Sequence, residues 1–231
     1  MEQSRRLFLG STAALGSAAV IGGGAFLFTD RGASAQSAGG DLIARELWRQ
    51  QREALRGLRG PKAGEAARKL ASLLRLNAAM AAGDDARITA AIRATIRREG
   101  KDHYLLKDLE PAHWASALQE AGLPRNTPRP PIDYAAKAAA IDELARLGPG
   151  AVLNRFADDF EKMSGAIEAQ AAVVRPAARR MSIDCNALDR QLAASSAFAA
   201  ICCGIAPATP ICYSALSVLA GTLAVFGAFC L

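Results

Sequence analysis

Apolar positions across residues 41–180 recur at intervals of three and four, as on one face of an amphipathic helix. The clearest series are Ile43, Leu47, Trp48 and Leu55; Leu70, Leu73, Leu74 and Met80; Ile88, Ala91, Ile92, Thr95 and Ile96; and Leu153, Phe156, Phe160, Met163, Ile167, Gln170 and Val174. The last keeps a heptad-like spacing over about three heptads, which favours a contact within one bundle. No stretch alternates apolar and polar residues as a strand does. The pattern predicts an all-α helical bundle.

Proline and glycine divide this bundle into segments. Pro111 is expected to start a short helix that Gly122 ends. Residues 124–131 contain four prolines and predict an extended linker. A helix over 132–147 stops at Gly148, and the next one runs to Val174 before Pro176. The expected organisation is a helical segment over 36–123, the linker 124–131, a helical pair over 132–180 and a tail over 181–231.

The tail differs from the rest of the chain because residues 191–231 contain no Asp, Glu, Lys, Arg or His. The whole chain of 231 residues has 28 Lys and Arg against 22 Asp and Glu, a net charge of +6. A helix over 211–231 therefore has no polar face and is about long enough to span a bilayer. Three interpretations compete: the buried central hairpin of the bundle, a membrane anchor, and a membrane-active peptide carried behind a protective segment.

All five cysteines lie in this tail, and their spacing predicts a pairing. Cys185 to Cys203 and Cys212 to Cys230 are both 18 residues apart, about five helical turns or roughly 27 Å. The Pro-containing breaker at 204–211 folds the two helices antiparallel. Cys203 then meets Cys212 beside the turn and Cys185 meets Cys230 at the open end, with Cys202 free. A bridge between Cys202 and Cys212 is the rival. The facing stripes are Cys185, Leu188, Leu192, Ser195, Ala199 and Cys203, and Cys212, Leu216, Leu219, Leu223, Phe226 and Cys230.

The amino terminus carries an export pattern. Residues 4–9 contain Arg5, Arg6, Phe8 and Leu9, and this hexapeptide resembles the twin-arginine translocation signal. An uncharged stretch follows, and then the small-x-small cleavage site with its key residues Ala33 and Ala35. The resemblance implies recognition by the twin-arginine translocation machinery, and export to the periplasm or medium of a prokaryote. The alternative is an uncleaved amino-terminal anchor.

Chemistry-bearing residues are sparse. Glu110 and His113 stand at i, i+3, but a di-metal site in a helical bundle needs a second such pair, so no metal site is predicted. No nucleophile elbow and no phosphate loop is present, so no catalytic residue, cofactor or small-molecule substrate is expected.

The arginine clusters predict solvated helix faces; nucleic acid is a poor partner for an exported protein, whereas anionic lipid headgroups fit. These clusters are Arg49, Arg52, Arg56 and Arg59; Arg97 and Arg98; and Arg179 and Arg180.

A twin-arginine signal, a charged helical middle and an apolar Cys-bearing end together resemble the precursors of microhalocin-type peptide bacteriocins. The resemblance lies in this layout and in residues 185–231, especially 200–205 and Cys212 to Cys230. It implies that the apolar end is released as a toxin and that the preceding part acts as its immunity protein. Arg179-Arg180 offers a processing site that would release 181–231. The alternatives are an uncut structural or binding protein of the cell envelope and, third, an enzyme.

Overall fold

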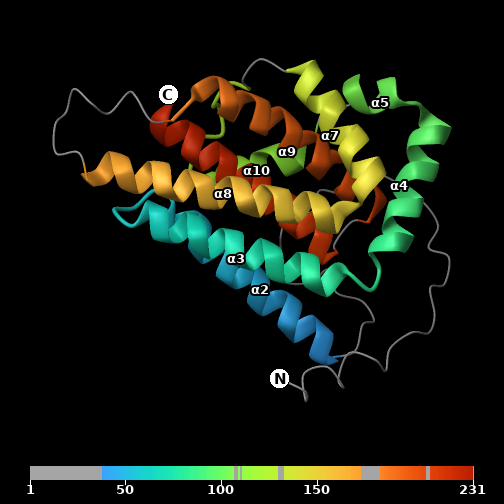
Figure 1. Cartoon of the computed structure of the whole chain (residues 1–231), viewed down its shortest axis with the longest axis horizontal. Helices are drawn as coiled ribbons and strands as arrows, with labels where there is room; N and C mark the ends of the chain where they lie inside the picture. The colour runs from blue at the N-terminus through green and yellow to red at the C-terminus, as the bar shows by residue number, and fades with distance from the viewer. Residues whose placement is uncertain are drawn as a thin grey trace.

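The computed structural model describes residues 38–106, 109, 111–129, 133–172, 183–206 and 209–230. Every regular element in these ranges is a helix, which confirms the all-α prediction (Figure 1). The helices are α2 (Ala38–Gly57), α3 (Ala63–Ala81), α4 (Asp85–Glu99), α5 (Lys101–Leu106), α6 (Pro111–Ala121), α7 (Tyr134–Leu147), α8 (Pro149–Ala172), α9 (Cys185–Ile205) and α10 (Pro210–Phe229).

Several sequence predictions lie outside the described residues. The export motif with Arg5, Arg6, Phe8 and Leu9 is among them, and so is the cleavage site at Ala33 and Ala35. The dibasic pair at 179–180 and Glu110 are also outside. These remain predictions from the sequence alone.

Glycine, proline and capping side chains set the helix ends. α6 begins at Pro111 and stops before Gly122, which has a positive φ of 69°. α7 stops before Gly148, whose φ of 84° is a left-handed conformation that favours glycine. The start of α7 is later than predicted because the Asp133 carboxylate accepts a hydrogen bond from the Ala136 amide at 2.9 Å, as an N-cap does. α5 was not predicted at all.

Helices α3 and α8 lie side by side, with α2 packed on α3 (Figure 1). Leu153, Phe156 and Phe160 of the heptad-like series are fully buried in the core, as an internal bundle contact requires. Ion pairs flank this contact: Arg68 lies 2.5 Å from Glu168, and Arg75 lies 2.7 Å from Asp158. Rising numbers on α3 pair with falling numbers on α8, so the two helices are antiparallel.

The tail forms the centre of the bundle. α9 and α10 pack against each other, α7 covers α9, and α2, α3, α6 and α8 contact α10. From Ile211 to Val225 every residue of α10 is buried except Tyr213, which is partly buried. α10 is long and apolar enough to cross a membrane, and no other described helix meets that test; 78% of the tested stretch lies inside the protein. The structure therefore matches the buried-hairpin interpretation of the tail.

Gly221 lets side chains of two outer helices approach the backbone of α10 closely. A Cβ placed there would lie 2.6 Å from Cζ of Phe160 on α8 and 2.9 Å from Cδ2 of Leu70 on α3. Distances below 3.0 Å are essentially never seen for real Cβ atoms, so a side chain here forces both neighbours apart. The missing side chain lets two large apolar groups reach the α10 backbone.

Replacing Gly221 by Ala is expected to destabilise the protein by about 1–3 kcal/mol, because overpacking outweighs alanine's better helix propensity. The matched control is Gly165→Ala, at an exposed mid-helix position with nothing within 4 Å, which is expected to leave stability unchanged or raise it by up to about 1 kcal/mol. Urea unfolding of both variants measures the difference. Equal midpoints for the Gly221→Ala variant and the parent would contradict the close approach.

Candidate functional site

Two disulfides close the α9–α10 hairpin at its two ends. Cys203 is bonded to Cys212 beside the turn, with Cα atoms 4.6 Å apart, and Cys185 to Cys230 at the open end, with Cα atoms 5.8 Å apart. Both pairs are those that the equal spacing predicts. The prediction works because α9 and α10 are unbroken helices of matched length, so five turns up one arm meet five turns down the other.

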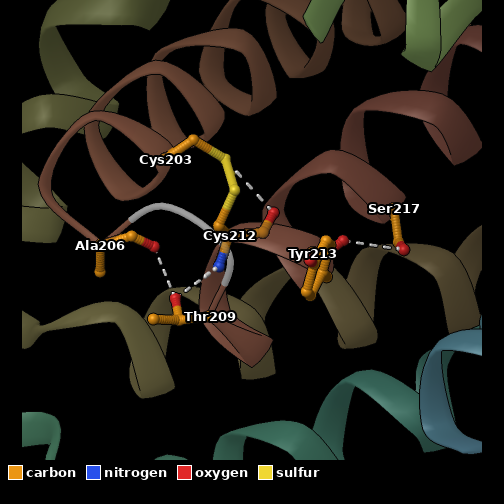
Figure 2. Close-up of a disulfide and its surroundings, with 6 residues drawn as sticks. All are labelled: Cys203, Ala206, Thr209, Cys212, Tyr213 and Ser217. Carbon is orange, nitrogen blue, oxygen red and sulfur yellow. Dashed lines mark hydrogen bonds between the residues drawn. A yellow bond between two sulfur atoms is a disulfide. The ribbon is translucent and has the colours of Figure 1, made fainter. Parts of the chain in front are cut away.

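The Thr209 side chain stabilises the turn between α9 and α10 with two hydrogen bonds (Figure 2). Its hydroxyl donates to the Ala206 carbonyl at 2.7 Å and accepts from the Cys212 amide at 3.4 Å. It thereby caps α10 and ties it to Ala206, the first residue after α9. Pro210 stands in the first turn of α10, where its missing N–H costs nothing. At the other end Asp184 caps α9 by accepting from the Asn186 amide at 2.9 Å.

Cys202 is the free cysteine, and it is 1% exposed. Burial raises the pKa of this thiol well above its ordinary value, and the negative charge of Asp85 raises it further. Thiol–disulfide exchange needs a thiolate. Cys212 is bonded to Cys203 and Cys202 is free, so the rival pairing of Cys202 with Cys212 is not the one found, and the raised pKa of the Cys202 thiol disfavours exchange with the neighbouring bridge.

Buried hydroxyls of the hairpin bond mainly to their own helix. Four of them lie within hydrogen-bond distance of a carbonyl three or four residues earlier, a common arrangement for Ser and Thr inside helices. The bonds are Ser195 to Leu192 at 3.0 Å, Ser196 to Ala193 at 2.9 Å, Ser217 to Tyr213 at 3.0 Å and Thr222 to Val218 at 2.9 Å. Except for Ser217, whose hydroxyl also lies within hydrogen-bond distance of Gln51 on α2, these hydroxyls need no partner from the surrounding helices.

Gln51 of α2 makes the buried polar contact with α10. Its side chain is 1% exposed, its Oε1 lies 2.8 Å from the Ser217 hydroxyl, and its Nε2 lies 3.5 Å from Ser214. Beside it the rings of Trp48 and Tyr213 lie 5.3 Å apart. If this contact is lost, the Ser217 hydroxyl can still donate to the Tyr213 carbonyl, whereas the Gln51 amide loses its partners on α10. The contact therefore matters more to Gln51 than to Ser217. Sequence analysis missed Gln51, although it stands four residues after Leu47 and four before Leu55 on the apolar face.

A hollow of about 430 Å³ lies between α7, α8 and α9. Three of its charged groups are paired: Arg155 lies 2.8 Å from Glu143 and 3.4 Å from Asp159. Burial raises the pKa of Asp159, and the nearby Arg155 lowers it in part. Among the described residues no group of three His, Cys, Asp or Glu stands close enough to hold a metal ion. The hairpin is accordingly the better candidate for function.

Arginines of the predicted clusters lie mainly on exposed faces, and several are paired. Arg49 bonds Glu46 at 2.8 Å and also contacts Glu53, both on its own helix. Arg52 is half-buried and lies 3.0 Å from Glu120 of α6. Surface ion pairs of this kind contribute about 0–1 kcal/mol each to stability. They keep the outer face polar and do little to hold the bundle together.

Removing the outer bridge with Cys185→Ala and Cys230→Ala is expected to cost more stability than removing the inner one. The outer bridge joins residues 45 apart and the inner one residues 9 apart. Chain entropy alone gives about 4 kcal/mol for the longer loop and about 2.5 kcal/mol for the shorter one. Denaturant unfolding of the two double variants tests the order, and a larger loss for Cys203→Ala with Cys212→Ala would contradict it.

Ser217→Ala is expected to cost about 1–3 kcal/mol, because it strips the buried Gln51 amide of its closest partner. Adding Gln51→Leu should recover most of this loss, since an apolar side chain then fills the site. The control is Ser195→Ala, a fully buried hydroxyl bonded to its own helix, which should change stability far less. Thermal unfolding measures both variants. If Ser195→Ala lowers stability as much as Ser217→Ala does, the importance of the Gln51 contact is contradicted.

Comparisons with known proteins give the chain no relative: no protein-family model matches it, and neither a curated protein nor a solved structure does. Any functional proposal therefore has to come from the arrangement of its own residues. The arrangement that stands out is an apolar helical hairpin with no charged residue after Arg190, joined by a disulfide at each end and enclosed by amphipathic helices.

Proposed function

We propose that this chain is an exported, non-enzymatic helical protein that carries its apolar hairpin in buried form. Separated from the other helices, the hairpin becomes membrane-active, in the manner of a bacteriocin-like precursor. Its partners are then the twin-arginine translocation machinery during export and a lipid membrane afterwards. Neither a cofactor nor a nucleic acid takes part.

One observation carries this proposal: disulfides join the two arms of the hairpin to each other, whereas mainly packing holds the hairpin to the other helices. Two disulfides hold α9 to α10, while α2, α3, α6, α7 and α8 contact them through side chains. The chain connects the two parts through residues 173–182, which include Arg179-Arg180. A cut there would leave a hairpin with both arms still stapled.

The physical properties of α10 favour lipid over water as the second environment. Twenty helical residues extend about 30 Å, the thickness of a bilayer's hydrocarbon core. The arm has no charged side chain, and its hydroxyls at Ser217 and Thr222 are bonded to its own backbone. Exposing 400 Å² of apolar surface to water costs about 10 kcal/mol. A released hairpin lowers its free energy by entering a membrane.

Structural disulfides such as Cys185–Cys230 and Cys203–Cys212 are typical of proteins that work outside the reducing cytoplasm. An oxidising, non-cytoplasmic compartment therefore suits the bridges between α9 and α10. The twin-arginine resemblance of residues 4–9 agrees with that compartment. We propose the periplasm or the external medium as the place where the protein acts.

A second candidate is an uncut binding or structural protein of the cell envelope. It is favoured by the continuity of the core, because buried residues of α2, α3, α6, α7, α8, α9 and α10 form a single apolar cluster. In such a protein the hairpin is the permanent centre of a folded bundle, and no membrane activity is expected.

Cleavage of the purified, disulfide-bonded protein separates the two candidates. A specific protease site replaces residues 179–180, and dye release from phosphatidylglycerol vesicles is measured before and after cutting. The proposal expects release only after cutting, and its loss in a Leu219→Asp variant, which places a charge at the centre of α10. Mass spectrometry of the secreted protein is expected to find a peptide over 181–231.

Two results would contradict membrane activity: vesicles that stay intact after complete cleavage, and secretion of only the uncut chain. Both would favour the envelope protein. The Leu219→Asp variant is first checked for secretion with both bridges formed, so that misfolding is not mistaken for loss of activity.

A further inference from the structure

The two disulfides differ sharply in how well reductants can reach them. Cys203 and Cys212 are 4% and 3% exposed, whereas Cys185 and Cys230 are only half-buried. In thiol–disulfide exchange a thiolate must approach one sulfur along the line of the bond it breaks. A reductant in solution therefore reaches the outer bridge long before the inner one.

The outer bridge also lies where the hairpin has least cover. In the last turn of α10, Phe226 and Gly227 are half-buried and Phe229 is 36% exposed. Opposite, in the first turn of α9, Asn186 and Ala187 are exposed. The non-covalent contacts of this turn include Phe226, which packs against the core, and Leu123, which lies against Gly227. The open end consequently depends on its bridge far more than the turn end does.

The turn end is held by several independent interactions. Ile201, Ile211 and Ala215 are almost fully buried around the inner bridge. The Thr209 hydroxyl links the two arms there as well (Figure 2). Loss of the outer bridge leaves this end and the middle of α10 in place.

We propose that Cys185–Cys230 is a redox latch that a dithiol reductant opens selectively in the intact protein. One thiolate of the reductant attacks a sulfur of the bridge, the other cysteine sulfur leaves as a thiolate and takes up a proton, and the second thiol resolves the mixed disulfide. The reductant becomes a cyclic disulfide and the protein gains two thiols. The last turn of α10 and the first turn of α9 then separate, while the inner bridge and the core stay closed.

The latch is a property of the uncut bundle, so it holds or fails independently of the hairpin's release and of any membrane activity. It predicts two states of the folded protein in one compartment, set by the local supply of dithiol. In the closed state the apolar end of α10 is fixed against α9; in the open state it is free to meet a partner.

The test treats the intact purified protein with increasing dithiothreitol, traps thiols with iodoacetamide and maps the labelled peptides. Labelling of Cys185 and Cys230 is expected to be at least about tenfold faster than that of Cys203 and Cys212. In the same samples, amide hydrogen exchange at 226–230 is expected to rise about tenfold while 211–225 stays protected. Equal labelling rates, or faster labelling of the inner pair, would overturn the proposal.

Two variants control for the bridge itself. Cys185→Ala with Cys230→Ala should show the fast exchange at 226–230 without any reductant, and Cys203→Ala with Cys212→Ala should keep it slow. If the outer-bridge variant exchanges at 226–230 as slowly as the parent, the bridge is no latch. The labelling order in the parent protein decides the question even if a variant fails to fold.

Discussion

A helix without a polar face has to be covered on every side, and the structure of this protein follows from that constraint. α10 has no charged residue, and burying its apolar side chains away from water favours the folded state. α9 covers one side, and α2, α3, α6 and α8 cover the others. Many of their charged residues face outward, as the exposed pair of Arg75 and Asp158 illustrates. The amphipathic helices thus serve as the solvent-facing shell of the hairpin.

The two disulfides and the packed core stabilise different parts of this arrangement. The bridges fix the register of α9 against α10, so the hairpin can persist as a unit, while packing and the Gln51 contact fix its place among the other helices. Covalent bonds within the hairpin and non-covalent contacts around it are the arrangement on which the proposed release of the hairpin depends.

Much of this could be predicted from the sequence, because helices translate spacing directly into geometry. The equal 18-residue separations identified both bridges, and the series from Leu153 identified the contact of α8. Contacts that depend on tertiary packing could not be predicted. Gln51 looks like any polar residue until α10 brings Ser217 to it, and Gly221 looks like a weak helix residue until Phe160 packs against it. The difference in exposure between the two bridges is likewise invisible in the sequence.

The claim on which the whole account depends is that α10 lies inside the intact folded protein. Hydrogen exchange of the purified chain over residues 38–231, without lipid or detergent, tests it most directly, because buried helices in a cooperative core exchange only through global unfolding. The account predicts that amides of residues 211–225 are the slowest to exchange and that the protein stays monomeric in solution. Rapid exchange in this segment, or a chain that is soluble only in detergent, would contradict it.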